Sequence, residues 1–371
     1  MTRVVFETAT LADSIRKAAS IAPGRAGDSF DKAAGIMIEV YPEQELVILR
    51  ATDLLLWYME WVGVLEVHGE PVRWRVPSKV FEAIISAFPL GSGKTVALEA
   101  DGSSLKIESS RTRAKLRLID PKSYPDWFAF PAEELKLVPE IGARIAQVEW
   151  AAAKDVPSLG IRFTGTQIVA TDKYRLAAVP LELEGVGEGI TVPPSILSTI
   201  LKRVGETRVG VTDTHLLLMP DDRTQVKIIR VGEHYPPIQK AMRRDHPNSV
   251  KFRKSHVIDA VNRATKIGSD RFPVLRLIIG KEEFATFMAE EELGHIGDVV
   301  ELSGQAQHDR IEIRVHPQNF TEALTNAPSE EVIFYYDIQK PKTVLLRIDG
   351  GSGYDAWLAP RGDVPKSEVS Q

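Results

Sequence analysis

The sequence predicts an α+β protein built from three similar units of about 120 residues, each with two helices and about eight strands. Three observations lead to this prediction. Short stretches rich in Val, Ile, Leu, Phe and Tyr, bounded by Gly, Pro, Asp or Ser, dominate the chain and are typical of strands. Apolar residues at i, i+3, i+4 and i+7 predict helices in six places. The helices, and short motifs beside them, recur at a nearly constant interval.

The elements follow one another in a repeating order. The clearest strand-like stretches are residues 34–40, 45–51, 95–99, 105–109, 114–119, 208–211 and 332–336. The predicted helices are residues 11–21, 78–87, 141–154, 195–204, 255–267 and 318–327. Alternate helices follow each other at steps of roughly 115–130 residues. We therefore expect each unit to contribute one early and one late helix.

Local motifs repeat with the helices. The tetrapeptide ATDL at 51–54 recurs as ATDK at 170–173, and VPS at 76–78 recurs as VPPS at 192–195. A Tyr-Pro pair closes the first two units, at 124–125 and 235–236. Pro77, Pro194 and Pro317 stand in or just before a first helical turn, where a missing N–H is tolerated, and Ser78 or Ser195 is a candidate cap.

Composition excludes several classes of protein. The 371 residues include no cysteine, which excludes disulfides, thiolate metal sites and thiol nucleophiles. No window approaches the ~18 apolar residues of a membrane helix, and an acid stands early in the N-terminal segment. We therefore expect a soluble, cytoplasmic protein. The net charge, 46 − 51 = −5, provides no global attraction to nucleic acid.

Signatures of chemistry are few. Residues 91–95, GSGKT, look like the end of a phosphate-binding loop, but Phe88 stands where the pattern needs a glycine and a strand-like stretch follows where it needs a helix. A turn is the better interpretation. The eight histidines are scattered without zinc-site spacing, and there is no GxSxG motif. This absence favours a binding protein over an enzyme.

Basic residues gather on the predicted helices, while most acids lie in strand and turn segments. Two interpretations remain open: helices of opposite sign to the rest of the chain, or ordinary helices with solvated Lys and Arg faces.

The most specific motif is ATDKYRLA at 170–177, which is similar to the ATDGHRLA run of a known family. VPSKVF at 76–81, Gly24-Arg25 after the first helix and Tyr235-Pro236 match as well. On these residues the chain resembles the bacterial replicative sliding clamp, the β subunit of DNA polymerase III, from about residue 2 to residue 360.

The resemblance implies three DNA-clamp domains, each with two helices backed by antiparallel sheets. Their expected bounds are 1–126, 127–245 and 246–360, and 361–371 is predicted to be a disordered tail. Two chains would join head to tail through domains 1 and 3, forming a ring around duplex DNA. Such a processivity factor needs no cofactor and catalyses nothing, and it tethers the DNA polymerase, the clamp loader and repair proteins.

The resemblance also implies two kinds of site. Basic side chains on the helices would contact phosphates without reading bases; the candidates are Arg25, Lys79, Arg144, Lys154, Lys202, Arg203, Lys254 and Arg263. A pocket between domains 2 and 3 would bind short linear motifs; its matching positions are Leu159, Thr171, Tyr174, Arg175, Leu176, Pro236, Lys240, Ala241, Phe272, Asn319, Trp357, Leu358 and Pro360. A core role is the other interpretation of Leu176, Trp357 and Leu358.

One departure affects the expected pocket. Lys173-Tyr174 replaces the common Gly-His, which predicts a bulkier and more basic rim and leaves the preferred motif open. Two alternatives to a clamp also remain: an enzyme of nucleic-acid metabolism that uses the loop at 91–95, and a ring or scaffold protein unrelated to replication.

Overall fold

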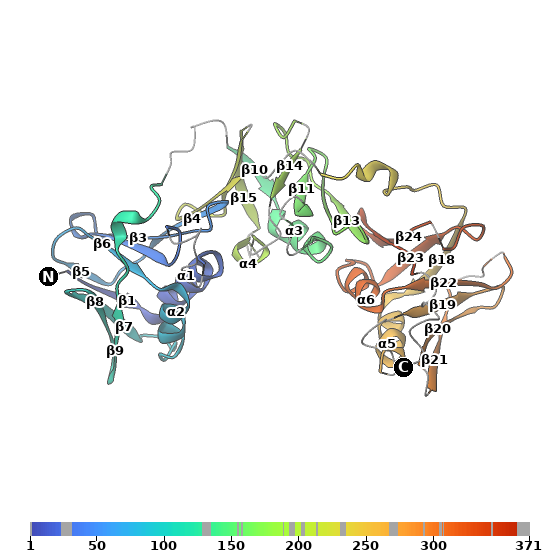
Figure 1. Ribbon diagram of the computed structural model, residues 1–371, viewed down its shortest axis with the longest axis horizontal. Coiled ribbons are helices and arrows are strands. Elements are labelled where there is room, and N and C mark those ends of the chain that lie inside the picture. The colour runs from blue at the N-terminus through green and yellow to red at the C-terminus, as the bar shows by residue number, and fades with distance from the viewer. Residues whose placement is uncertain are drawn as a thin grey trace, which may run out of the picture. The chain divides into compact units, whose positions relative to one another are not determined.

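The computed structural model describes residues 2–23, 32–127, 135–153, 156, 159–187, 189–192, 197–201, 205–212, 214–230, 235–266, 274–291, 294–303, 306, 308–342 and 344–361 (Figure 1). In these ranges the chain forms six α-helices and 25 strands, and the strands pair antiparallel throughout. This confirms the predicted α+β class. The chain divides into two compact units, Met1–Gly142 with Ile196–Val231, and Ala143–Ser195 with Gly232–Gln371.

The first unit contains two sheets. One has the strand order β5-β1-β7-β8-β9, and the other has the order β10-β15-β16-β17-β4-β3-β2-β6. The strands are β1 (Arg3–Glu7), β2 (Ile36–Tyr41), β3 (Leu46–Thr52), β4 (Leu56–Val62), β5 (Glu66–His68), β6 (Val72–Val76), β7 (Thr95–Asp101), β8 (Ser104–Ser109), β9 (Thr112–Arg117), β10 (Lys136–Pro139), β15 (Glu206–Val211), β16 (His215–Met219) and β17 (Thr224–Ile229). The helices are α1 (Thr8–Ile21), α2 (Ser78–Ser86) and α4 (Leu197–Leu201).

Helix α1 shows how the first unit builds its core. Leu11, Ile15, Ala18 and Ala19 are buried, and their spacing places them on one side of the helix. This side packs on β3 and β4, and α1 also packs against α2. Burying a side chain as large as Leu11 or Ile15 contributes about 1.5–3 kcal/mol. The amphipathic spacing therefore holds the helix on the sheet.

The second unit also contains two sheets, with strand orders β14-β11-β12-β13-β25-β24-β23-β18 and β21-β20-β19-β22. The strands are β11 (Ile161–Phe163), β12 (Gln167–Thr171), β13 (Arg175–Pro180), β14 (Ile190–Val192), β18 (Asn248–Arg253), β19 (Leu275–Ile279), β20 (Phe284–Glu291), β21 (Gly294–Glu301), β22 (Ile311–Val315), β23 (Glu331–Tyr336), β24 (Leu346–Gly351) and β25 (Tyr354–Leu358). Its helices are α5 (Lys254–Ala264) and α6 (Pro317–Thr325), and α3 (Ile141–Glu149) spans the sequence boundary between the units.

Aromatic residues form the core beneath α6. Phe320 of α6 lies 6.1 Å from Phe287 and 5.4 Å from Phe334, between ring centroids, and Phe252 lies 4.6 Å from Phe334. All four rings are fully buried. Aromatic pairs at these separations contribute about 0.5–1.5 kcal/mol beyond their burial, so this cluster fixes α6 against the strands beneath it.

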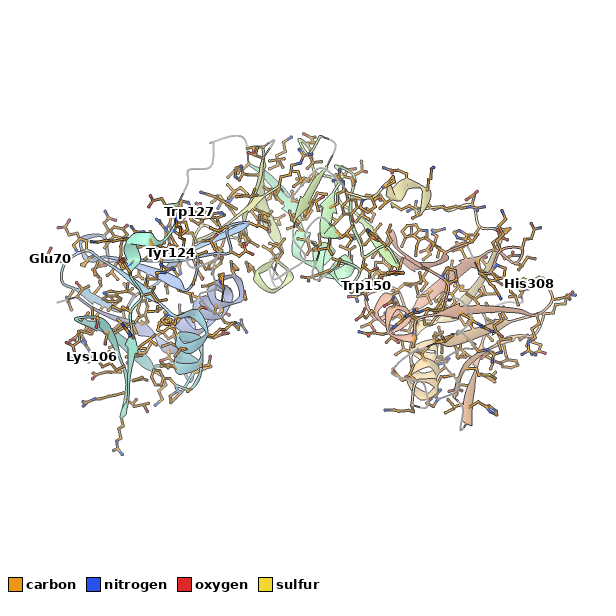
Figure 2. All side chains as sticks on the ribbon, viewed as in Figure 1. Glu70, Lys106, Tyr124, Trp127, Trp150 and His308 are labelled. Carbon is orange, nitrogen blue, oxygen red and sulfur yellow. The ribbon has the colours of Figure 1, made fainter. Side chains whose placement is uncertain are left out.

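The repeated Tyr-Pro pairs have a common packing role. Tyr124 is buried, its hydroxyl donates to the Arg50 carbonyl at 3.2 Å, and the Arg75 guanidinium carbon lies 5.3 Å from the ring centroid (Figure 2 labels Tyr124). Tyr235 repeats this arrangement with Arg162 at 5.2 Å. Burial raises the pKa of both tyrosines. The motif therefore marks a tyrosine ring packed against an arginine from a neighbouring strand.

The predicted helices are confirmed in all six places, with some ends shifted. Residues 154, 195–196, 202–204 and 267 of the predicted ranges lie outside the described residues. Pro77 precedes α2 and Pro317 opens α6, as predicted, whereas Pro194 and Ser195 lie outside the described residues. The predicted cap at Ser78 is wrong: Ser78 is the first helical residue, and its hydroxyl donates to the Pro23 carbonyl at 3.3 Å.

The division into three domains remains a prediction. Two continuous sheets cross the expected domain boundaries. Strand β17 pairs with β4 from Thr224↔Glu60 to Ile228↔Leu56 in the first unit. Strand β13 pairs with β25 from Arg175↔Leu358 to Ala178↔Asp355 in the second. Each pairing joins the expected middle domain to one of its neighbours.

The loop at 91–95 is a tight turn. The Lys94 amide donates to the Gly91 carbonyl at 3.1 Å, Gly93 has φ +72°, and β7 begins at Thr95. A helix does not follow, so its N-terminus cannot complete a phosphate site there, and the turn interpretation is confirmed. In the described ranges, no helix is long and apolar enough to cross a membrane. Of the predicted tail at 361–371, residues 362–371 lie outside the described residues.

Candidate functional site

The Thr-Asp motif forms the turn between β12 and β13. The Thr171 hydroxyl donates to the Arg175 carbonyl at 2.7 Å and accepts from the Lys173 amide at 3.0 Å. Oδ1 of Asp172 accepts from the amides of Tyr174 at 2.9 Å and Arg175 at 3.0 Å. These bonds hold Lys173 at φ +80°, a left-handed conformation that disfavours residues other than glycine.

The first copy of the motif makes the same turn between β3 and β4. Thr52 bonds the Leu56 carbonyl and the Leu54 amide, both at 2.9 Å, and Oδ1 of Asp53 accepts from the amides of Leu55 and Leu56. Leu54 has φ +76°. The repeated motif is therefore a turn-forming device, and its carboxylate serves backbone amides.

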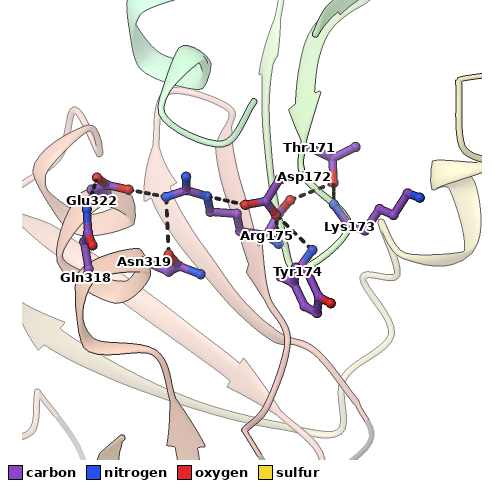
Figure 3. A network of polar contacts seen from close by, with 8 residues as sticks. All are labelled: Thr171, Asp172, Lys173, Tyr174, Arg175, Gln318, Asn319 and Glu322. Atoms are coloured by element: carbon purple, nitrogen blue, oxygen red, sulfur yellow. Dashed lines mark hydrogen bonds and ion pairs between the residues drawn. The ribbon is translucent and has the colours of Figure 1, made fainter. Parts of the chain in front are cut away.

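Only the second copy extends into a side-chain network, which is drawn in Figure 3. Nε of Arg175 donates to Oδ2 of Asp172 at 2.9 Å. Its Nη1 donates to Oδ1 of Asn319 at 3.3 Å and also pairs closely with Glu322. The Trp150 ring lies 5.5 Å from the guanidinium carbon. Arg175 thus links the turn to α6 and to the residue after α3, and its Nε and Nη1 are already bonded within the chain.

The strand register separates the predicted peptide-binding residues onto two faces of one sheet. Leu176 pairs with Trp357, and Arg175 pairs with Leu358. Neighbours along a strand point to opposite faces. Leu176 and Trp357, with Thr171, therefore occupy one face, whereas Arg175 and Leu358 occupy the face that carries Asn319 of α6.

The face of Leu176 and Trp357 carries an apolar cluster that includes residues from the segment before β18. Its buried members are Val169, Leu176, Ala178, Ile238 and Trp357, and the partly buried ones are Tyr235, Ala241, Met242 and Leu345. Leu176 and Trp357 are 3% and 0% exposed, so both belong to the core. We name this arrangement, together with the exposed Tyr174, the β13 patch.

Polar contacts fix the segment 238–246 over the β13 patch. Nε1 of Trp357 donates to the Arg243 carbonyl at 3.0 Å. Arg244 contacts the buried Asp355 carboxylate at 2.5 Å, and Nε of Arg347 donates to its other oxygen at 2.7 Å. A ring nitrogen of His246 lies 3.0 Å from the Leu345 carbonyl. A buried carboxylate between two guanidiniums is a strong restraint, and it ties this segment to β24 and β25.

The other predicted peptide-binding positions vary in exposure. Leu159 and Leu358 are buried, Pro236, Ala241 and Pro360 are partly buried, and Lys240 and Tyr174 are exposed. Tyr174 is 71% exposed, and the bulkier rim expected from Lys173-Tyr174 stays a prediction. Phe272 lies outside the described residues. The sequence reasoning missed Ile238, Met242 and Leu345. Ile238 and Met242 reach this cluster because the segment 238–246 folds back on the sheet, and Leu345 stands just before β24.

The candidate DNA contacts are partly engaged within the chain. Lys79 of α2 pairs with Glu82 at 3.2 Å, and Arg263 of α5 pairs closely with Asp298. Nζ of Lys254 donates to the Ala327 carbonyl at 2.7 Å, just beyond the C-terminus of α6. Arg144 is partly buried on α3. Arg25, Lys154, Lys202 and Arg203 lie outside the described residues.

A hollow that the sequence did not indicate lies beside α5. It has a volume of about 430 Å³ and is lined by His256, Asp259, Arg263, Phe284, Val299, Val300 and Glu301. Within the described ranges, no three His, Asp or Glu side chains are grouped closely enough to hold a metal ion.

The helices on antiparallel sheets, with a repeated Thr-Asp turn and a repeated Tyr-Pro closure, define a protein of the DNA-clamp fold class. The chain matches the DNA polymerase III β subunit of Thermotoga maritima with a TM-score of 0.85 and 19% identity, covering 98% of this chain and 100% of that one. A sliding clamp from Bartonella birtlesii bound to griselimycin matches with a TM-score of 0.83 and 18% identity, over 98% and 100% of the two chains. The DNA polymerase III β subunit of Pseudomonas aeruginosa matches with a TM-score of 0.79 and 16% identity, over 97% and 99%.

These likenesses show that the chain has the fold of the bacterial DNA polymerase III β subunit, which confirms the fold that the sequence motifs implied. No protein-family model matches the chain, and no curated protein matches it.

Proposed function

We propose that this chain is a DNA sliding clamp, a processivity factor that encircles duplex DNA and tethers a replicative polymerase. The observation that carries the proposal is the end-to-end match with clamp structures, in which 98% of this chain accounts for 100% of the Thermotoga chain. The match therefore extends over the whole of that clamp chain. The motif ATDKYRLA supports the proposal independently, since it forms the turn at which the β13 patch begins.

The assembly we propose is a head-to-tail homodimer that closes through domains 1 and 3. Retention on DNA is then topological, so individual phosphate contacts can be weak. Lys79 is the first contact to test among the described candidates, because Nζ of Lys254 and the guanidinium of Arg263 are bonded to other elements of the chain. The exposed pair of Lys79 with Glu82 is no obstacle, since such pairs contribute about 0–1 kcal/mol.

The second proposed surface is the β13 patch, which would accept short linear motifs of the polymerase, the clamp loader and repair proteins. Apolar side chains on a partly buried surface, next to exposed backbone turns, suit a peptide that inserts Leu or Phe. In this proposal Arg175 and Asn319 act from the opposite face by holding the turn in place. The protein would use no cofactor and have no catalytic activity of its own.

The test of the clamp function uses nicked circular DNA loaded by the host's clamp loader. After removal of free protein, the DNA is linearised with a restriction enzyme. We expect the protein to stay on the circle and to leave after cutting, because a ring slides off a free end. Persistence on the linear DNA, or a monomer of 41.1 kDa in sedimentation at replication-like concentrations, would count against the ring.

An enzyme that uses the loop at 91–95 is disfavoured, because β7 rather than a helix follows this turn. Nucleotide binding by the purified protein would revive that alternative. A ring or scaffold unrelated to replication predicts instead that polymerase processivity is unchanged when the protein is added.

A further inference from the structure

Four cationic side chains lie at the rim of the β13 patch, and two of them are paired with a carboxylate of the chain. Lys173 lies in the turn between β12 and β13, and Lys240, Arg243 and Arg244 lie in the segment that covers the sheet. Arg243 pairs with Asp245, and Arg244 pairs with Asp355. The two arginines are therefore neutralised within the chain.

The two lysines have no such partner. Lys173 and Lys240 are both exposed, and within the described residues neither ammonium group has a carboxylate within ion-pair distance. The nearest acid in sequence to Lys173 is Asp172, whose carboxylate is used by Arg175 and by the turn amides. The turn also holds Lys173 at positive φ, with the Thr171 hydroxyl accepting its amide, which fixes the point from which the side chain extends (Figure 3).

The other exposed and partly buried members of the β13 patch are largely apolar. Tyr174 is 71% exposed, and Tyr235, Ala241, Met242 and Leu345 are partly buried around the core of Leu176 and Trp357. An apolar surface of this kind favours a short segment with large apolar side chains. The uncompensated positive charge of the two lysines then favours acidic residues next to those side chains, and it disfavours basic ones.

We propose that the β13 patch selects peptides whose apolar residues are flanked by Asp or Glu, with Lys173 and Lys240 as the residues that determine this preference. The inference rests on the proposed peptide-binding function and specifies the chemistry of its partner. Exposed ion pairs contribute up to about 1 kcal/mol each, which corresponds to roughly a fivefold change in affinity per lysine.

The test uses three fluorescein-labelled synthetic peptides that share one core of leucine and phenylalanine and carry paired aspartates, asparagines or lysines beside it. Dissociation constants come from fluorescence anisotropy with the full chain at low salt and at about 0.5 M salt, where charge interactions are screened. We expect the aspartate peptide to bind about three- to tenfold more tightly than the asparagine peptide at low salt. The lysine peptide should bind most weakly, and all three should converge at high salt.

Variants assign the preference to its residues. Lys173→Gln and Lys240→Gln should each reduce the ratio between the aspartate and asparagine peptides, and the double variant should abolish it without weakening the asparagine peptide. The control is Lys122→Gln, an exposed lysine of the first unit, which should leave every ratio unchanged.

The outcomes separate the inference from the function on which it rests. Griselimycin, the ligand bound to the Bartonella clamp, serves as a reference probe that shares none of the three peptide sequences. If griselimycin and the three peptides bind but the peptides bind equally well, the charge preference is wrong and the peptide site stands. If none of the four probes binds, the peptide site itself is wrong, and the inference falls with it.

Discussion

Asp172 serves two partners at once: its Oδ1 accepts the amides of the β12–β13 turn, and its Oδ2 accepts Nε of Arg175 at 2.9 Å. Asp53, in the matching turn of the first unit, accepts only turn amides among the bonds described, and burial raises the pKa of its carboxyl. The carboxylates of the two copies of the Thr-Asp motif are therefore in different electrostatic environments. The difference comes from Arg175, since Leu56 occupies the corresponding place beside Asp53.

Replacing each of these aspartates by asparagine should have opposite effects. Asp172→Asn keeps the turn acceptor but places an amide donor against Nε of Arg175, so we expect a loss of about 1–2 kcal/mol in the free energy of unfolding. In Asp53→Asn the buried charge disappears and the turn acceptor remains. A raised carboxyl pKa adds stability only at low pH and loses it as pH rises through the folded-state value, so this variant should be at least as stable as the parent at pH 7. Urea unfolding at pH 7 measures both, and equal losses would contradict the distinction.

Acidification below the ordinary histidine pKa of 6.5 should destabilise the fold. Burial lowers the pKa of His215, His246 and His316. Between the lowered values and 6.5 the unfolded chain binds more protons than the folded one, so stability rises with pH across this window and falls as pH drops. The thermal midpoint should therefore decline below pH 6.5, and His246→Gln should flatten the decline. The exposed His68→Gln is the control. An unchanged profile in His246→Gln would rule out its contribution.

The separation of the predicted peptide-binding residues onto two faces can be tested with neighbouring leucines. Leu176→Ala and Leu358→Ala both delete a buried side chain, and each should cost about 2–5 kcal/mol of stability. Only Leu176 lies in the β13 patch. If the β13 patch binds peptides as proposed, Leu176→Ala should weaken binding of a peptide with a leucine and phenylalanine core, whereas Leu358→Ala should leave this binding close to that of the parent. Calorimetric titration below the unfolding temperature of both variants measures this, and equal weakening would place the ligand elsewhere.

Two lysines on helices should contribute differently to DNA binding. Lys79 is exposed on α2, while Nζ of Lys254 is held by the Ala327 carbonyl. If Lys79 contacts a phosphate, Lys79→Ala should lower the slope of log affinity against log salt concentration by about 1. Lys254→Ala should leave this slope unchanged and lower the thermal midpoint, because a cation at a helix C-terminus is lost. Binding to a labelled duplex across a salt series measures the slopes, and the reverse ranking would show that Lys254 faces the DNA.

Helices and strands were predictable because their signals are local. The burial of Leu11, Ile15, Ala18 and Ala19 follows from their helical spacing alone, and Pro77 and Pro317 mark helix starts through a property of proline itself. The true partner of Ser78 was not predictable, because the Pro23 carbonyl that accepts its hydroxyl comes from a segment 55 residues away.

The peptide-binding residues show the same limit. Motif similarity indicates which positions belong together, but it carries no information on the strand register. Pairing of β13 with β25 decides that Leu176 meets Trp357 and that Arg175 meets Leu358. A shift by one residue would exchange the two faces, and nothing local to either strand specifies their mutual register.

The sequence by itself determined the α+β class, the six helices, and the repeated Thr-Asp and Tyr-Pro motifs, because spacing, turn chemistry and proline act over a few residues. Only the tertiary structure decided which cations are available. Arg175, Arg244 and Lys254 read as equivalent basic residues along the chain, yet each is held by a partner far away in sequence. Ion pairing depends on distances of a few ångströms, which the fold sets and the order of residues does not reveal.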